Sequence, residues 1–360
     1  MSGSSVKLMV IFGGDTPEHE VSLAGAQTVL MHAYALGWDV LPVGVTRDGH
    51  WLVGLGALER LWADADSELL PAGSVPADQV VGAGGPVDDF DGPPPLSALA
   101  RYRMALPVCH GHWGEDGTLQ GLLRCYGLRI VGCGVTASAI CFDKQLAKAV
   151  LGDAGLPVAR GVLVREVELA ADPCGVIERI RDAVGAEPWF VKPARGGSSL
   201  GIASAHSAAE LREALGRALG WDDAALVEEL IPHRELVLGV LGRRHLTVSP
   251  PGECIPMGAL YTYEEKYRLG NPRFTCPAAI DARLTRQAQE LAADAFRVLG
   301  CSVFARVDLF LDRRTGDFLI NEVNTIPGMT AASVFPKVMQ AAGYPYPDLL
   351  VELCRLATDG

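Results

Sequence analysis

The first 45 positions switch between two patterns of apolar residues. Residues 6–12 form a short apolar run that meets Gly13 and Gly14, which predicts a buried strand followed by a tight turn. Residues 21–36 carry apolar side chains at helical spacing, and another apolar run follows at residues 40–45. Strand, turn, helix and strand in this order predict a Rossmann-like parallel sheet.

A further apolar run, at residues 105–109, predicts another strand of this sheet, ending at His110. A helix is expected to begin near Thr118. Ligands of open parallel sheets gather at the carboxyl ends of the strands, so the segment after His110 is a candidate site. Residues 63–100 contain no basic residue and are rich in Pro, Gly and Asp, which predicts surface loops with edge strands and no chemistry.

The second half of the chain shows helical and strand periods in alternation. Residues 138–155 are expected to be helical, and Gly155, Leu156 and Pro157 form a helix stop. A strand at residues 158–164 would then enter a second domain. The remaining predicted elements are strands at residues 189–191, 236–241, 303–311 and 317–322, and a helix at residues 284–299.

Length and composition narrow the class of protein. A chain of 360 residues is too long for one compact core, so two or three domains around a shared cleft are expected. The net charge of -12 offers no long-range attraction for nucleic acid or anionic lipid, which argues against both partners. The first apolar run is too short for a signal peptide or a membrane span, so a cytoplasmic protein is expected. Nine cysteines without a Cys-x-x-Cys pair indicate buried reduced thiols.

The first candidate for chemistry is the segment KPARGGSSLG at residues 192–201, which follows a predicted strand. Small residues around a lysine let backbone N–H groups approach phosphate oxygens while the ammonium neutralises them. No Gly-Lys-Ser/Thr sequence closes the segment and no helix pattern opens at its glycines, so it is neither a P-loop nor a dinucleotide fingerprint. A flexible hairpin remains an alternative interpretation.

The second candidate lies on two successive strands. The period of two places Arg306 with Asp308, and Glu322 with Asn324, on common faces. Two carboxylates and an amide oxygen are hard ligands of the kind that Mg²⁺ prefers. A surface ladder of charge pairs is the alternative, but the turn at residues 325–330 would bring backbone donors close to a metal.

Six motifs in order carry a family resemblance: GGDTPEHEVSL at residues 13–23, HGHWGEDGTLQG at 110–121, KPARGGSSLG at 192–201, YEEKY at 263–267, ARVDLF at 305–310 and NEVNTIPGMT at 321–330. By these motifs the sequence resembles the D-alanine:D-alanine ligases of the ATP-grasp superfamily, from about residue 6 to about residue 350. The resemblance implies an α/β ATP-grasp fold of three domains, the first with the Rossmann-like sheet. The implied boundaries are residues 1–139, 140–228 and 229–360.

The implied reaction is the ATP-dependent joining of two D-alanines for peptidoglycan precursor synthesis. The first D-alanine carboxylate takes the γ-phosphoryl group, and the amine of the second displaces phosphate from the acyl phosphate. Phosphoryl transfer between anions needs cations on both partners. The expected cofactors are therefore ATP and two Mg²⁺ or Mn²⁺ ions, and a homodimer is expected from the family.

The resemblance also assigns substrate contacts. Glu18 would receive the ammonium of the first D-alanine in a hydrogen-bonded set with Ser198 and Tyr267, although a carboxylate at a helix start is favoured by the helix dipole in any case. His110 would lie beside the same substrate, and a plain strand-end histidine is the alternative. Ser333 would hold the carboxylate of the second D-alanine.

Catalytic, metal and nucleotide roles follow in the same way. Arg306 and the backbone N–H of Gly328 would stabilise the tetrahedral oxyanion. The residues implied as metal ligands are Asp308, Glu322 and Asn324. The residues implied as nucleotide contacts are Lys144, Lys192 and Lys266 at the phosphates, and Glu228, Glu229, Leu230 and Glu235 at adenine and ribose.

Two departures from the family pattern concern the nucleotide. Glu229 stands where many members have a lysine, and Leu260 where an aromatic residue often packs on adenine. Sister ligases that use D-serine or D-lactate as the second substrate are alternatives, and Tyr267 argues against D-lactate because a phenol beside Glu18 and Ser198 suits an amine nucleophile. A nucleotide-binding protein without catalysis is the alternative from another class.

Overall fold

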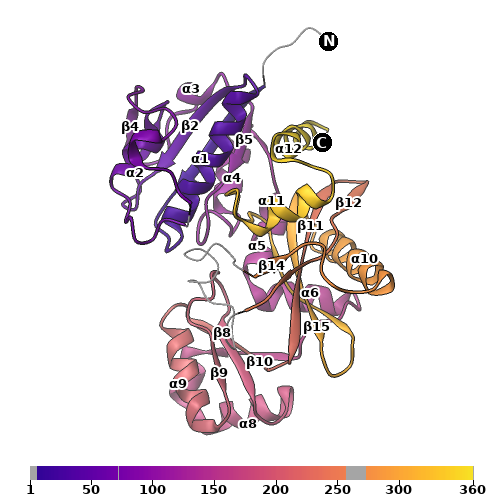
Figure 1. Ribbon diagram of the computed structural model, residues 1–360. Coiled ribbons are helices and arrows are strands. Elements are labelled where there is room, and N and C mark those ends of the chain that lie inside the picture. The colour runs from indigo at the N-terminus through magenta and orange to yellow at the C-terminus, as the bar shows by residue number, and fades with distance from the viewer. Residues whose placement is uncertain (1–5, 72, 257–272, 360) are drawn as a thin grey trace.

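The computed structural model describes residues 6–71, 73–256 and 273–359, and within these ranges the strands form three sheets (Figure 1). The first sheet lies at the top left of Figure 1, the second at the bottom and the third at the right. The first has the order β4 (Asp88–Phe90), β3 (Trp51–Val53), β2 (Asp39–Val45), β1 (Lys7–Gly13), β5 (Met104–Pro107) and β6 (Arg129–Ile130).

The first sheet has the predicted parallel centre. Strand β1 runs parallel to β2 and β5, and β5 runs parallel to β6, while β3 and β4 add antiparallel strands at one edge. The expectation of edge strands in residues 63–100 is confirmed by β4. The turn after β1 requires glycine, since a Cβ on Gly13 would lie 2.2 Å from the carbonyl oxygen of Val45 and its φ is +88°.

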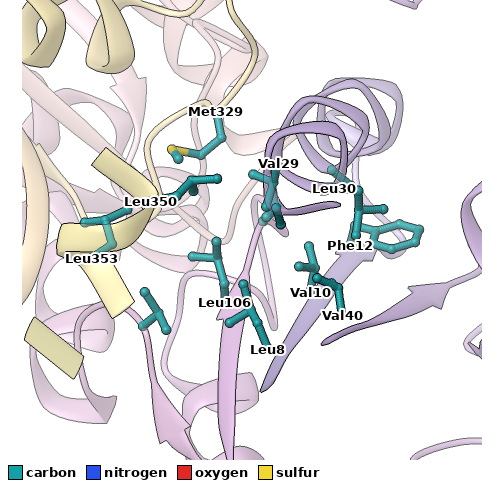
Figure 2. Close-up of a cluster of buried hydrophobic side chains, with 14 of the residues drawn as sticks. Leu8, Val10, Phe12, Val29, Leu30, Val40, Leu106, Met329, Leu350 and Leu353 are labelled. Atoms are coloured by element: carbon teal, nitrogen blue, oxygen red, sulfur yellow. The ribbon is translucent and has the colours of Figure 1, made fainter. Parts of the chain in front are cut away.

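Helices from both ends of the chain cover the first sheet. Figure 2 shows Val29 and Leu30 of α1 (His19–Ala35) packed against Val10 of β1, and Leu350 of α12 (Tyr346–Thr358) near Leu106 of β5. Met329 joins the same buried cluster. The remaining helices of this part are α2 (Ala57–Ala63), the 3-10 helix η1 (Ala77–Gln79), α3 (Leu96–Leu99) and α4 (Thr118–Cys125).

The segment predicted as one helix over residues 138–155 is two helices, α5 (Val135–Phe142) and α6 (Lys144–Asp153). Asp143 interrupts the helix because its backbone is extended and its carboxylate accepts a hydrogen bond from the N–H of Leu146 at 3.0 Å, which caps α6. The break turns the N–H of Lys144 toward the carbonyl oxygen of Ala194, at 3.0 Å. A local side-chain cap thus overrides the continuous apolar pattern.

The second sheet is antiparallel, with the order β7 (Gly161–Arg165), β10 (Ala224–Glu229), β8 (Trp189–Pro193) and β9 (Ala203–Ala205). Strand β7 begins later than predicted, because Val158 instead forms a bridge with Ile320 of the third sheet. The helices of this part are α7 (Glu166–Ala171), α8 (Pro173–Val184) and α9 (Ala208–Leu219). The apolar faces of α8 and α9 pack in one buried cluster with β7, β8 and β10.

The third sheet has the order β14 (Phe274–Thr275), β13 (Gly252–Cys254), β11 (His233–Gly242), β15 (Val303–Asp312) and β16 (Phe318–Asn324), with β12 (Leu246–Val248) paired to β11. Helix α10 (Ala282–Val298) packs with α5 and α6 on this sheet in one buried cluster. Helix α11 (Val334–Ala341) contributes Phe335 and Met339 to the buried cluster that includes the first sheet.

Among the described residues, no helix is long and apolar enough to cross a bilayer.

Candidate active site

Two adjoining cavities lie where the three sheets meet. The smaller, of about 110 Å³, is lined by residues of the segments that follow β1 and β5, of the third sheet and of the segment 325–334. The larger, of about 720 Å³, extends between the second and third sheets. Residues that line both cavities include Glu18, Lys144, Ser198, Glu235 and Glu322. A reactant in one cavity would therefore be within reach of a reactant in the other.

Glu18 and Ser198 join the first sheet to the glycine-rich loop. The Ser198 hydroxyl donates a hydrogen bond to Glu18 Oε1, and the Glu18 side chain is 7% exposed. Ser198 has a φ of +57°, a conformation that non-glycine residues rarely adopt. Arg195 anchors the start of the loop, because its N–H and guanidinium both donate to Asp222. The loop is thus fixed so that its serine meets the carboxylate.

His110 and Glu115 line the smaller cavity beside Glu18. Burial lowers the pKa of His110, so its imidazole is neutral at pH 7, and its buried Nε2 has no hydrogen-bond partner within the described part of the chain. Burial and the charge of Glu18 raise the pKa of Glu115 to about 8, although its carboxylate accepts from the N–H of Gly111 at 2.8 Å. The cavity therefore offers an imidazole nitrogen and a second carboxyl group to a small polar ligand.

Two lysines face the larger cavity from different elements. Lys144, at the start of α6, donates to the carbonyl oxygen of Gly196 at 2.5 Å, and burial lowers its pKa. Lys192, on β8, is buried and lies 2.8 Å from Glu228 Oε2. Both predicted phosphate lysines that the structure describes line the larger cavity together with the glycine-rich loop.

The residues expected at adenine and ribose line the larger cavity together. Glu229, at the end of β10, pairs with Arg160 at 3.1 Å, and the Leu230 N–H donates to the Pro188 carbonyl oxygen at 3.2 Å. Glu235 lies on β11, opposite Phe310 of β15. The negative charge of Glu229, which stands where many family members have a lysine, is therefore compensated by the guanidinium of Arg160.

The expected metal ligands lie side by side on β15 and β16. Asp308 is opposite Glu322 in the register, and the Asn324 amide nitrogen lies 3.3 Å from Asp308 Oδ2. No group of three or more His, Cys, Asp or Glu side chains suited to a metal occurs among the described residues. Two carboxylates and an amide oxygen on neighbouring strands nevertheless fit Mg²⁺, which takes few protein ligands and completes its shell with phosphate and water.

Arg306 lies on β15 beside the carboxylates of Asp308 and Glu322. Its guanidinium donates to both oxygens of Asp308, at 2.8 and 2.7 Å, and lies 3.8 Å from Glu322 Oε1. Gly328 sits against Ser333, since a Cβ on Gly328 would lie 2.8 Å from Ser333 Oγ. The Thr330 N–H donates to the same Oγ at 3.2 Å. The residues of this group all line the smaller cavity: Arg306, Asp308, Glu322, Gly328, Thr330 and Ser333.

Three residues named from the sequence, Lys266, Tyr267 and Leu260, lie outside the described residues. The structure also adds two residues that the sequence reasoning missed. Lys148 lies one helical turn after Lys144 and pairs with Glu228, and the i, i+4 spacing of the two lysines was the available signal. Glu115 belongs to the motif at residues 110–121, but no spacing rule indicated that its carboxyl group would lie near Glu18.

The fold and site define an ATP-grasp enzyme of the α/β class. The model of the "D-ala D-ala ligase N-terminus" family matches residues 7–133, and that of the "D-ala D-ala ligase C-terminus" family matches residues 150–355. The chain belongs to the D-alanine:D-alanine ligase family.

Named relatives match over nearly the whole chain. A D-alanine–D-alanine ligase of Caldicellulosiruptor bescii is 36% identical over 99% of this chain and 96% of its own. One of Chlorobium luteolum is 38% identical over 97% and 96%. The structure of the D-alanine–D-alanine ligase from Coxiella burnetii superposes with a TM-score of 0.78 at 30% identity, covering 99% of this chain and 96% of that one. The VanG D-Ala:D-Ser ligase from Enterococcus faecalis superposes with a TM-score of 0.79 at 33% identity, covering 98% and 100%.

Proposed function

We propose that this protein joins two D-alanines to D-alanyl-D-alanine at the expense of ATP, through a D-alanyl phosphate, for peptidoglycan precursor synthesis. The observation that carries the proposal is the pair of adjoining cavities with Glu18, Lys144 and Glu322 in the walls of both. One cavity suits a nucleotide and the other a small zwitterion. Full-length similarity to proteins named D-alanine–D-alanine ligase supports the same assignment.

The first D-alanine binds by its ammonium to Glu18. The Ser198 hydroxyl keeps the carboxylate oriented, and His110 Nε2, which has no partner among the described residues, supplies a polar contact to the same ligand. Burial of Glu18 strengthens its attraction for the ammonium, because water screens a charge less in a closed site. The roles expected of Lys266 and Tyr267 stay part of the proposal.

ATP binds in the larger cavity. The adenosine lies against Glu228, Glu229, Leu230 and Glu235, and the phosphates lie against Lys144, Lys192 and the glycine-rich loop. Fixed ammonium groups and backbone donors of this kind align the γ-phosphoryl group with the attacking carboxylate and reduce the repulsion between the two anions.

Asp308, Glu322 and Asn324 would hold the divalent ions, two Mg²⁺ or Mn²⁺. Bound there, the ions would supply positive charge to the β- and γ-phosphates. Arg306 lies on the same strand as Asp308, so its guanidinium lies next to the metal ligands and can stabilise negative charge on the neighbouring acyl group. The ligand set is supported by the strand register and by the chemistry of its oxygens.

The second D-alanine binds with its carboxylate at Ser333, which lies at the start of α11. Its amine, after loss of a proton, attacks the acyl carbon of D-alanyl phosphate; a C–N bond forms, the C–O bond to phosphate breaks, and inorganic phosphate leaves. Arg306 and the Gly328 N–H stabilise the negative oxygen of the tetrahedral intermediate.

Three domains with limits at residues 139 and 228 are proposed. The three separate sheets support the number of domains, whereas residue 139 lies within α5 and residue 228 within β10. A homodimer in the cytoplasm is proposed from the family resemblance. Sedimentation of the purified protein would test the assembly.

The experiment that tests the function offers the purified enzyme ATP, Mg²⁺ and each of D-alanine, D-serine and D-lactate, alone and in pairs. Phosphate release and the products are measured together. Phosphate and D-alanyl-D-alanine in equal amounts are expected with D-alanine alone. A mixed dipeptide or ester as the main product would reassign the second substrate, and the absence of amino-acid-dependent phosphate release would refute the proposed ligase activity.

A further inference from the structure

Glu228 lies buried between two lysines that come from different elements. Lys148 Nζ lies 2.7 Å from Glu228 Oε1, and Lys192 Nζ lies 2.8 Å from Oε2. The three side chains are 7%, 6% and 2% exposed for Lys148, Lys192 and Glu228. Burying three charges is costly unless they compensate one another, and here one carboxylate is shared by two ammonium groups.

The strands and helix that hold this cluster explain its geometry. Glu228 and Lys192 are diagonal neighbours on the same face of β10 and β8, because Lys192 is opposite Leu226. Gly161 on β7 leaves room for the glutamate, since a Cβ there would lie 3.1 Å from Glu228 Cγ. Lys148 reaches the carboxylate from α6, one turn after Lys144.

The charges of the cluster do not cancel. Two ammonium groups and one carboxylate leave a net charge of about +1. Burial opposes ionisation of Glu228, but Lys192 and Lys148 outweigh it and lower its pKa, so the carboxylate stays charged. Lys192 and Glu228 line the larger cavity, whereas Lys148 is absent from the described residues that line either cavity.

We propose that Lys148 is a positioning residue for the nucleotide phosphates. It holds Glu228 from the side of α6, and its ammonium compensates the carboxylate so that the positive charge of Lys192 remains available toward the cavity. Without Lys148, Glu228 would pair with Lys192 alone, and the pair would present no net charge to a triphosphate. This inference rests on the proposed ATP site. Because Glu228 stays paired with Lys192 when Lys148 is lost, its contact with adenosine should be kept and the effect should fall on the phosphates.

The test is a set of charge variants of the whole protein, assayed by calorimetric binding of ATP and of adenosine. Lys148→Met brings the cluster to net zero, whereas Lys148→Arg keeps it at net +1. Lys7→Met, which removes an exposed lysine on β1, is the matched control. The dissociation constant for ATP is expected to rise about tenfold in Lys148→Met, the order of one charge-assisted contact, while that for adenosine is unchanged. Lys148→Arg should keep most of the ATP affinity.

The outcomes separate this inference from the proposed function. Wild-type ATP affinity in Lys148→Met, or an equal loss for ATP and adenosine, would overturn the role of Lys148. Should Lys148→Met fail to fold, Lys148→Gln still decides, because it removes the charge but keeps a hydrogen-bond donor for Glu228, and wild-type ATP affinity in it contradicts the charge argument. A wild-type protein that binds no ATP would instead refute the nucleotide site itself.

Discussion

The hydroxyl of Ser198 donates a hydrogen bond to Glu18 Oε1, across 180 positions of the chain. The bond connects the helix after β1 with the glycine-rich loop after β8, and both residues line both cavities. A contact between such distant segments means that the loop and the first sheet can orient one substrate together.

Glu18→Gln is expected to raise the KM for D-alanine by about tenfold to a hundredfold, because a hydrogen bond to a charged group contributes roughly 1.5–3 kcal/mol. The KM for ATP should change little. Initial rates over a range of D-alanine concentrations would measure both constants. Glu20→Gln is the matched control: Glu20 is buried in the first turn of α1, two residues after Glu18, but pairs with Arg47, so its loss should lower the melting temperature without changing the KM for D-alanine. Equal kinetic effects of the two substitutions would contradict the role of Glu18.

Removal of divalent metal by a chelator is expected to abolish phosphate release, and added Mg²⁺ should restore it. In Asp308→Asn the Mg²⁺ needed for half activity should rise on the order of a hundredfold, or activity should not return, because one of two carboxylate ligands is lost. Asp312→Asn is the control on the same strand, since Asp312 pairs with Arg314 and is absent from the described residues that line the cavities. A normal Mg²⁺ titration in Asp308→Asn would remove the metal assignment.

Gly328→Ala is expected to lower kcat by about 10² fold. The new Cβ would lie 2.8 Å from Ser333 Oγ, so Ser333 and the backbone around Gly328 must shift, and misplacement by about 1 Å in a site of this kind has roughly that cost. Single-turnover rates of dipeptide formation would measure the change. Gly121→Ala on α4 is the control, because its Cβ would meet no atom within 4 Å. An unchanged rate in Gly328→Ala would show that this turn has no part in catalysis.

Glu115 predicts a pH dependence of stability. Its pKa is raised from 4.5 to about 8 in the folded protein, so the folded state binds its proton more tightly than the unfolded chain does. The stability that comes from this protonation is fully present below about pH 4.5 and is lost as the pH rises toward 8, by up to roughly 1.4 kcal/mol per pH unit. Glu115→Gln stays uncharged, so its free energy of unfolding relative to wild type should increase across this window. Urea denaturation at pH 5 and pH 8.5, without metal or nucleotide, would measure it.

The exposed Glu213 on α9 provides the control for this experiment. Glu213→Gln should give a difference in unfolding free energy that stays constant between the two pH values. If the difference in unfolding free energy between variant and wild type were also constant for Glu115→Gln, the predicted effect of burial on Glu115 would be contradicted.

Much of the fold could be predicted from the periods of the apolar residues. The run that ends at Gly13 and the helical pattern after it correspond to β1 and α1, and the alternation around Asp308 and Glu322 corresponds to β15 and β16. These elements bury one face or lie fully inside, so the pattern follows directly from burial. The break at Asp143 could not be seen in that way, because it depends on a side-chain cap within an unbroken apolar pattern.

The candidate site divides in the same manner. Motifs along the chain indicated the chemistry of Lys192, Asp308 and Glu322, since residue types and local spacing suffice to name phosphate and metal ligands. Lys148 and Glu115 were missed because their roles arise from contacts between α6 and β10, and between the segment after β5 and the start of α1.

By itself, the sequence determined the types of element, the order of the motifs and the candidate phosphate and metal ligands, because backbone periodicity and ligand chemistry are local properties of the chain; the kind of reaction followed from the resemblance of the motifs to a family. The tertiary structure alone decided which charges share a partner. In the sequence, Glu228 is one acidic residue of a predicted strand. In the folded protein, α6 and β8 bring the ammonium groups of Lys148 and Lys192 within 2.8 Å of its carboxylate oxygens. Burial and pairing are properties of surfaces brought together by folding, and no short segment contains both sides of such a contact.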